Sequence, residues 1–77
     1  MAKTVLERHR RRTKQFTEWM ATQRMGQELS QTQLAAMLGL HRGIIGNIEG
    51  GYRPQLSLAM ACDIVDALGY KFILRMK

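Results

Sequence analysis

Mostly apolar residues in the first third of the chain recur three and four positions apart, which is the spacing of one helix face. The set runs through Val5, Leu6, His9, Phe16, Trp19, Met20 and Gln23. This pattern fits one long helix over residues 5–25, and Thr4 with Glu7 fits a capping box at its beginning. Polar residues fill positions 10–15, so we expect firm helix only from about Arg12, after a segment that is either helical or a flexible arm.

Two shorter helices follow, and their boundaries are marked by residues that commonly begin and end helices. Ser30 and Gln33 have the spacing of a capping box, and Gly39 stands where a helix ends in a left-handed residue. His41 occupies the N-cap position of the next helix, which continues through Glu49. We therefore predict a pair of helices joined by a tight turn that contains glycine.

A fourth helix is predicted from its cap at Ser57 to Leu68, with Gly69 at its end. The residues expected to face inward are Leu58, Ala61, Cys62, Ile64, Val65 and Leu68. This apolar face would close a small core against the preceding helices.

The last residues of the chain change to a period of two, which is typical of a β-strand. Tyr70, Phe72, Leu74 and Met76 share one face, and Lys71, Ile73 and Arg75 share the other. A single strand leaves its backbone groups unpaired, so we expect two copies to pair antiparallel across a two-fold axis. The dimer contacts would come from Tyr70, Phe72, Ile73 and Leu74. The alternatives are a different protein docked on the strand edge, and a helix continued through Gly69, against which the alternation argues.

Residues 31–50, QTQLAAMLGLHRGIIGNIEG, have the spacing of a helix-turn-helix unit. Three requirements of this unit are steric. Ala35 is small because the third helix crosses over it, and Gly39 provides the positive φ of the turn. Ile45 and Ile48 lock the third helix onto the second. A generic helical hairpin would not need these residue types at these offsets.

The segment LSQTQLAAMLGLHRGIIGNIEGG resembles the Xre/Cro-type helix-turn-helix of phage repressors and bacterial regulators. The opening LSQ…LA…LG, the I..IE.G end of the third helix and the closing ALG at residues 67–69 carry the resemblance, which covers about residues 15–69. It implies an all-α fold, a compact bundle of four to five helices, to which the C-terminal strand is added. The chain would divide into a basic segment (1–14), the helix-turn-helix domain (15–69) and a dimerisation strand (70–77).

The resemblance also implies roles for residues of the motif. The groove-facing positions of the recognition helix are matched by Arg42, Gly43, Gly46 and Asn47. The positions expected to meet phosphates are Gln31, which also suits an outer base, Gln33, His41 and Arg53. Arg24 and Glu49 match a pair that forms a salt bridge under the motif, which is a structural role.

The two glycines of the recognition helix depart from the family pattern, which has polar side chains there. Each glycine lowers helix propensity by roughly 0.8–1 kcal/mol relative to alanine. Bare backbone at Gly43 and Gly46 would let the helix lie deep in the major groove, where Arg42 suits guanine and Asn47 suits adenine. The alternative is an interface for close packing of another helix.

Composition excludes several classes of protein. With 77 residues the chain is one small domain, and its 45% hydrophobic content is too high for a disordered chain. The longest apolar run, residues 58–62, is too short to cross a membrane, and no secretory signal is expected. Cys62 is the only cysteine and has no partner for an internal disulfide, which fits a reducing cytoplasm. No Cys/His cluster has metal-binding spacing, so we expect neither a metal nor a cofactor.

The charge points to a polyanion as partner. The formal net charge is +6 and the pI is about 10.3, and residues 1–15 carry six Lys and Arg residues against Glu7 alone. We expect Arg10, Arg11 and Arg12 to meet phosphates, with anionic lipid or a merely solvated face as the alternatives.

These observations predict a cytoplasmic, sequence-specific regulator that binds double-stranded DNA, most simply a dimeric repressor on an inverted repeat. The alternative is an antitoxin that neutralises a partner toxin and regulates its own operon, since the C-terminal strand resembles that of some antitoxins. No acid–base pair, nucleophile set or phosphate loop has catalytic spacing, so we expect no enzyme.

Overall fold

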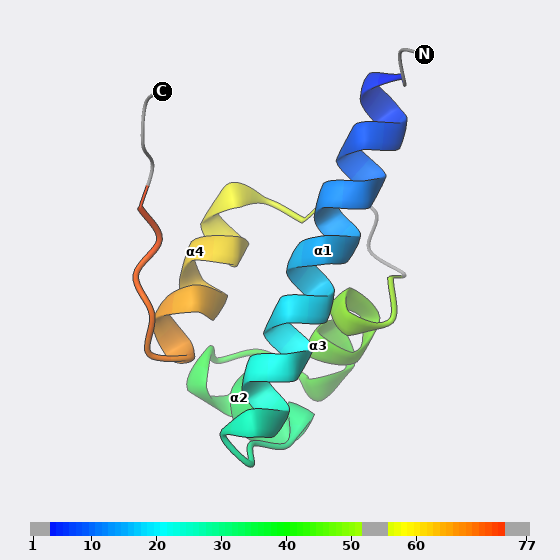
Figure 1. Cartoon of the computed structure of the whole chain (residues 1–77). Coiled ribbons are helices and arrows are strands. Elements are labelled where there is room, and N and C mark those ends of the chain that lie inside the picture. The colour runs from blue at the N-terminus through cyan, green and yellow to red at the C-terminus, as the bar shows by residue number, and fades with distance from the viewer. Residues whose placement is uncertain (1–3, 52–55, 74–77) are drawn as a thin grey trace.

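The computed structural model describes residues 4–51 and 56–73, which form four helices (Figure 1). They are α1 (Val5–Gly26), α2 (Gln31–Met37), α3 (Arg42–Glu49) and α4 (Leu58–Ala67). In Figure 1, α4 and the segment after it lie on one side of α1, and the first turns of α1 project beyond the other helices. The predicted all-α class and the helix-turn-helix order of α2 and α3 are confirmed for this part of the chain.

Helix α1 is continuous from Val5, so our prediction of firm helix only from about Arg12 was wrong. The Oγ1 of Thr4 accepts a hydrogen bond from the amide of Glu7 at 3.1 Å, which caps the helix. Extending an existing helix costs much less than nucleating one, and arginine, lysine and glutamine are good helix formers. The run of polar residues at 10–15 therefore interrupts the apolar face of the helix but not the helix itself.

The predicted boundaries of α2 are confirmed in atomic detail. The Oγ of Ser30 accepts from the amide of Gln33 at 3.0 Å, and the Oε1 of Gln33 accepts from the amide of Ser30 at 2.7 Å, which completes the capping box. At the other end Gly39 has φ +68°, and the amide of Leu40 donates to the carbonyl of Ala35 at 2.8 Å. This hydrogen bond closes a Schellman motif, which requires the left-handed residue that glycine provides.

The same motif ends α1 without a glycine in the left-handed position. Glu28 has φ +60°, and the amide of Leu29 donates to the carbonyl of Arg24 at 3.0 Å. The neighbouring Gly26 belongs to the helix itself, where nothing lies within 4 Å of an added Cβ. The helix therefore ends on a residue that adopts this conformation at a cost, which the sequence pattern did not reveal.

A small core forms where the four helices meet. It consists of Met20, Leu34, Ala35, Ile45, Ile48, Ile64 and Leu68, all buried. The inward positions predicted for the helix-turn-helix are thus confirmed. The prediction for Leu58 was wrong, because its side chain is 61% exposed: the buried face of α4 begins one turn later, at Ala61. Cys62 is half-buried rather than buried.

The segment after α4 is fixed at its beginning by Tyr70. Its hydroxyl donates to the Oε1 of Gln23 at 2.7 Å, and its ring packs edge-on against Trp19 with centroids 5.4 Å apart. Helix α4 ends before it, with Gly69 at φ +88°, so the alternative of a helix continued through Gly69 is excluded. Residues 70–73 form no strand within this chain, and Leu74 lies outside the described residues, so pairing across a dimer stays a prediction.

None of the helices in residues 4–51 and 56–73 is long and apolar enough to cross a membrane.

We predict that Ala35→Leu destabilises the protein by about 1–3 kcal/mol, because overpacking a filled core forces neighbours out of place. Ala35 is only 1% exposed and belongs to the core cluster that contains Ile45 and Ile48 of α3. Ala36→Leu is the matched control, since Ala36 lies exposed on the same helix. Urea denaturation of both variants checks this. Equal stability of the two variants would mean that α3 does not cross α2 at Ala35.

Candidate nucleic-acid interface

The outer face of α3 brings together the four residues predicted to face a DNA groove. Arg42, Gly43 and Asn47 are exposed and Gly46 is half-buried. On the opposite face Ile45 and Ile48 are buried in the core, so the outer face is held in one orientation.

The two glycines on this face are not required by the fold. No heavy atom lies within 4 Å of a Cβ added at Gly43, and a Cβ at Gly46 meets only the Oε1 of Gln31, at 3.5 Å. Neither glycine has a positive φ. An alanine would therefore fit at both positions and favour the helix. What the glycines provide is bare backbone on the outside of α3.

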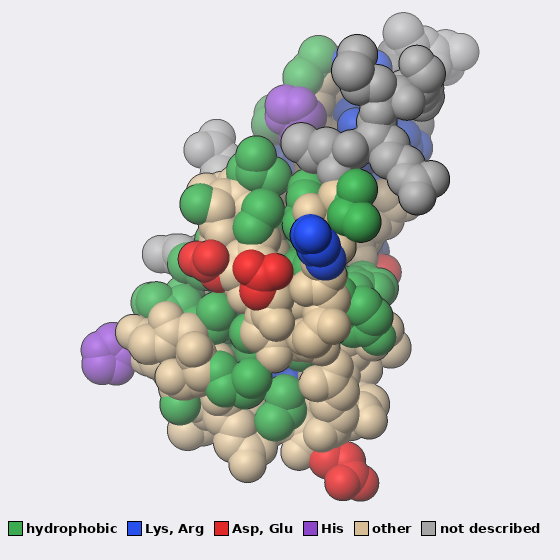
Figure 2. Space-filling model, turned by 90° about the vertical axis from the view of Figure 1, so that its left-hand side faces the viewer, with side chains coloured by type: hydrophobic (Ala, Val, Ile, Leu, Met, Phe, Trp, Pro, Cys, Tyr) green, Lys and Arg blue, Asp and Glu red, His purple; other side chains and the backbone are tan. Residues whose placement is uncertain are grey.

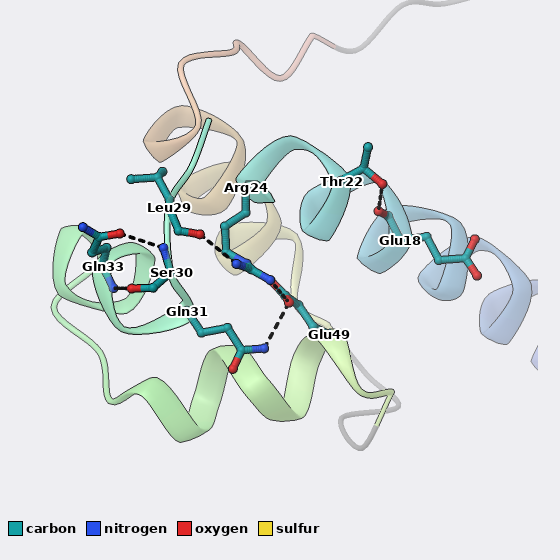
Figure 3. A network of polar contacts seen from close by, with 8 residues as sticks. All are labelled: Glu18, Thr22, Arg24, Leu29, Ser30, Gln31, Gln33 and Glu49. Carbon is teal, nitrogen blue, oxygen red and sulfur yellow. Dashed lines mark hydrogen bonds and ion pairs between the residues drawn. The ribbon is translucent and has the colours of Figure 1, made fainter. Parts of the chain in front are cut away.

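Helix α3 is tied to α1 by a bidentate salt bridge, as predicted (Figure 3). The Nε of Arg24 donates to the Oε2 of Glu49 at 2.8 Å, and the Nη2 donates to the Oε1 at 3.0 Å. The two side chains are only 12% and 8% exposed. The Nη1 of Arg24 also donates to the carbonyl of Leu29 at 2.7 Å, which ties the pair to the connection before α2.

The hydrogen bond with Glu49 raises the pKa of the Arg24 guanidinium, and the opposite charge adds to this, while burial acts the other way. Because its pKa is raised, the Arg24 guanidinium stays charged at every pH below the ordinary pKa of arginine, and titration of Arg24 weakens the pair only in strong alkali. The salt bridge is therefore intact across the physiological range.

The residues predicted to meet phosphates divide into three groups. The Nε2 of Gln31 donates to the Oε1 of Glu49 at 3.1 Å, so its side chain is held between α2 and α3. Gln33 is committed to the capping box, and His41 is an exposed N-cap whose side chain makes no cap hydrogen bond. Arg53 lies outside the described residues.

The positive charge gathers in the first half of α1, residues 5–14, which we call the basic arm. Its cations are Arg8, Arg10, Arg11, Arg12 and Lys14, all exposed. In the rest of the described chain the cations are Arg24, Arg42 and Lys71, and the acids are Glu18, Glu28, Glu49, Asp63 and Asp66. Figure 2 shows basic side chains at the end where α1 projects, both acidic and basic side chains over the middle of that face, and acidic charge at the opposite end.

The basic arm lies next to the C-terminal end of α3. A cleft of about 380 Å³ separates them, and its lining includes Arg10 and Lys14 from the arm and Glu49, Gly50 and Gly51 from the end of α3. The basic arm and the C-terminal end of α3 thus border one cleft, and the outer-face residues of α3 are not among those that line it.

Sequence reasoning missed the hydrogen-bond partners of Gln31 and Gln23. It paired Arg24 with Glu49 but did not join Gln31 to them, and it left Gln23 as an unexplained polar residue in a core position. The structure assigns Gln23 to the hydroxyl of Tyr70. A polar residue on an otherwise apolar helix face is the signal that could have indicated such a partner.

A sequence model of the helix-turn-helix family matches residues 20–73, more than half of the chain. The chain belongs to the helix-turn-helix family. This family consists of DNA-binding regulatory domains and is not a family of enzymes, which indicates a DNA-binding transcription regulator. The match includes α2, α3 and α4 and begins after the basic arm. Neither a curated protein nor a solved structure matches the chain.

No group of three or more His, Cys, Asp or Glu side chains within residues 4–51 and 56–73 of this helix-turn-helix protein is arranged to hold a metal ion.

We predict that Arg24→Leu destabilises the protein by about 3–5 kcal/mol, because it leaves the Glu49 carboxylate without its partner in a nearly buried position. The double variant Arg24→Leu/Glu49→Leu should recover part of this loss, since two apolar groups need no partner. Thermal unfolding followed by circular dichroism measures both effects.

The control is Glu18→Gln, which breaks the exposed pair of Glu18 with Lys14 at 3.9 Å and should cost well under 1 kcal/mol. A loss for Arg24→Leu as small as that of the control would show that the buried salt bridge does not hold α3 in place.

Proposed function

We propose that this helix-turn-helix protein is a sequence-specific regulator of the Xre/Cro type, a cytoplasmic dimeric repressor that reads an inverted-repeat operator through the major groove. The observation that carries the proposal is the outer face of α3. It combines bare backbone at two glycines with two exposed side chains suited to base edges.

The proposed contacts follow from the chemistry of these side chains. The guanidinium of Arg42 donates two hydrogen bonds to O6 and N7 of guanine, and the amide of Asn47 pairs with N6 and N7 of adenine. Gly43 and Gly46 let the helix axis approach the bases more closely than a helix with side chains there. Sequence-dependent DNA shape then adds to the selection.

Backbone contacts surround this reading face. We propose that His41 and the N-terminal region of α2, with Gln31 and Gln33, lie near phosphates on one side, together with Arg53. The basic arm, through Arg10, Arg11 and Arg12, supplies the phosphate contacts beyond the end of α3. In the described residues this arm holds most of the cations that are available to a polyanion.

A second candidate function is an antitoxin that binds a toxin and uses DNA binding for autoregulation. The observation in its favour is exposed apolar surface at the beginning of α4 and after its end, where Leu58 and Ile73 are 61% and 63% exposed and Phe72 is 38% exposed. The same surface serves a homodimer through residues 70–76. A dimer is the simpler use, because an inverted repeat needs two recognition helices about one turn, roughly 34 Å, apart.

Selection of bound sequences from a random pool of duplex DNA, with light scattering of the free and bound protein, tests the main proposal. We expect an inverted repeat and a dimer. A monomer on DNA at high micromolar concentration, or binding without any sequence preference, would contradict it.

We predict opposite effects of Gly43→Ala/Gly46→Ala on stability and on DNA binding. Stability should rise by up to about 2 kcal/mol, because alanine favours a helix interior and both methyl groups have room. Affinity for the selected operator should fall, because the methyl groups hold α3 away from the bases. Denaturation and fluorescence anisotropy measure the two quantities, and Gly26→Ala, at an open position at the end of α1, is the control. Unchanged affinity would mean that nothing approaches this face closely.

The basic arm and Arg42 should act differently on salt dependence and specificity. Each phosphate contact adds about 0.9 to the salt slope of log K on duplex DNA. Replacing Arg10, Arg11 and Arg12 by Gln should flatten that slope and weaken operator and random DNA alike, whereas replacing them by Lys should preserve it. Arg42→Ala should cost about 1–3 kcal/mol on the operator and relax one base position per half-site. If instead the arm variant loses base preference and Arg42→Ala only lowers affinity, the arm is the part that recognises the DNA sequence.

Deleting residues 71–77 should weaken dimerisation and operator binding together. This truncation keeps Tyr70 and its contacts with Gln23 and Trp19, so the domain should still fold. Sedimentation equilibrium and a circular dichroism spectrum of the truncated chain measure association and folding. A truncated chain that dimerises like the full chain would exclude strand pairing as the basis of the dimer.

A further inference from the structure

The side chain of Gln31 is oriented by a chain of hydrogen bonds that begins in the buried salt bridge. Glu49 is held at both carboxylate oxygens by Arg24, and its Oε1 also accepts from the Nε2 of Gln31 at 3.1 Å (Figure 3). An ionised carboxylate only accepts hydrogen bonds, so the amide nitrogen of Gln31 must face it. The orientation of this amide is therefore set by a neighbour that cannot itself turn.

This orientation places the amide oxygen of Gln31 against the bare backbone of α3. The Oε1 lies 3.5 Å from the position of a Cβ added at Gly46. Gly46 belongs to the outer face of α3, between Arg42 and Asn47 along the helix. Gly46 has no side chain, and the amide of Gln31 provides a polar group at that place on α3.

The groups that remain available on Gln31 decide which ligand atoms it suits. One N–H of the amide is used by Glu49, which leaves one N–H donor and the oxygen acceptor. A phosphate oxygen only accepts, so it would use the N–H donor and leave the amide oxygen without a partner. Guanine and thymine also present acceptors at O6 and O4 in the major groove. Adenine presents an N6 donor beside an N7 acceptor, which is the complement of the remaining pair.

We propose that Gln31 is a specificity-determining residue that reads an adenine at the base pair facing Gly46, and that Glu49 is the positioning residue that orients it. This inference rests on the proposed function, since it requires α3 in a major groove. It chooses the base contact of Gln31, which the family resemblance left open beside a phosphate contact.

The test compares the base preferences of variants in selection from a random duplex pool. In Gln31→Met, which keeps the length of the side chain and removes its polar atoms, the adenine preference at one position per half-site should disappear. Affinity for the operator should fall about 5- to 150-fold, which corresponds to the loss of one bidentate base contact. The preferences due to Arg42 and Asn47 should stay.

Gln15→Met is the matched control, because it makes the same substitution at an exposed glutamine of α1 to which no DNA contact is assigned. It should leave every base preference unchanged. In the double variant Arg24→Met/Glu49→Met, Gln31 is retained but its amide is free to turn. The adenine preference should therefore relax at the same position that Gln31→Met affects, a result that a merely structural role would not give.

Two outcomes would overturn the inference. If Gln31→Met weakens operator and random DNA equally, Gln31 meets a phosphate, and if it changes neither, Gln31 makes no contact. In both cases the wild-type protein still selects a sequence, so the proposed function stands. A wild-type protein that selects no sequence would instead contradict the proposed function, and the role of Gln31 with it. If the double variant does not fold, Gln31→Met and its control decide the question alone.

Discussion

The carboxylate of Glu49 connects three of the four helices. It stands on the last residue of α3 and accepts hydrogen bonds from Arg24 near the end of α1 and from Gln31 at the beginning of α2. Buried ion pairs contribute little net stability but strongly disfavour arrangements in which they are broken. This pair therefore fixes the register of α3 against the rest of the domain, and Arg24 extends the connection to the carbonyl of Leu29.

Because α3 is held from its inner side, its outer face need not contribute to the stability of the fold. Helices of this length are marginal in water, and two glycines weaken it further. Ile45 and Ile48 in the core and Glu49 in the salt bridge compensate from the inner side. The residue types on the outer face can therefore suit a ligand, because the fold does not depend on them. Its bare backbone has no role in the fold and gains one only when another surface approaches α3.

Those parts of the structure that depend on neighbours in the sequence were predictable. The capping box of Ser30 and Gln33 and the left-handed Gly39 follow from residue types three to nine positions apart, and the steric pattern of Ala35, Ile45 and Ile48 located the helix-turn-helix. Among contacts between distant residues, the salt bridge of Arg24 with Glu49 was expected only from the family resemblance, and others were not predictable. The contact of Gln31 with Glu49 and that of Tyr70 with Gln23 join residues 18 and 47 positions apart. The continuity of α1 was missed because polarity was taken as a break, although helix propagation depends on the backbone.

The most direct test of the central claim, that the outer face of α3 enters the groove, is NMR titration of labelled protein with the selected duplex. We expect the largest shift changes at the amides of Gly43 and Gly46 and at the side-chain amides of Asn47 and Gln31. The amides of Asp63 and Asp66 on the exposed side of α4 should hardly move. Changes confined to the basic arm, with α3 unaffected at saturation, would contradict the claim and leave the protein a sequence-independent binder of polyanions.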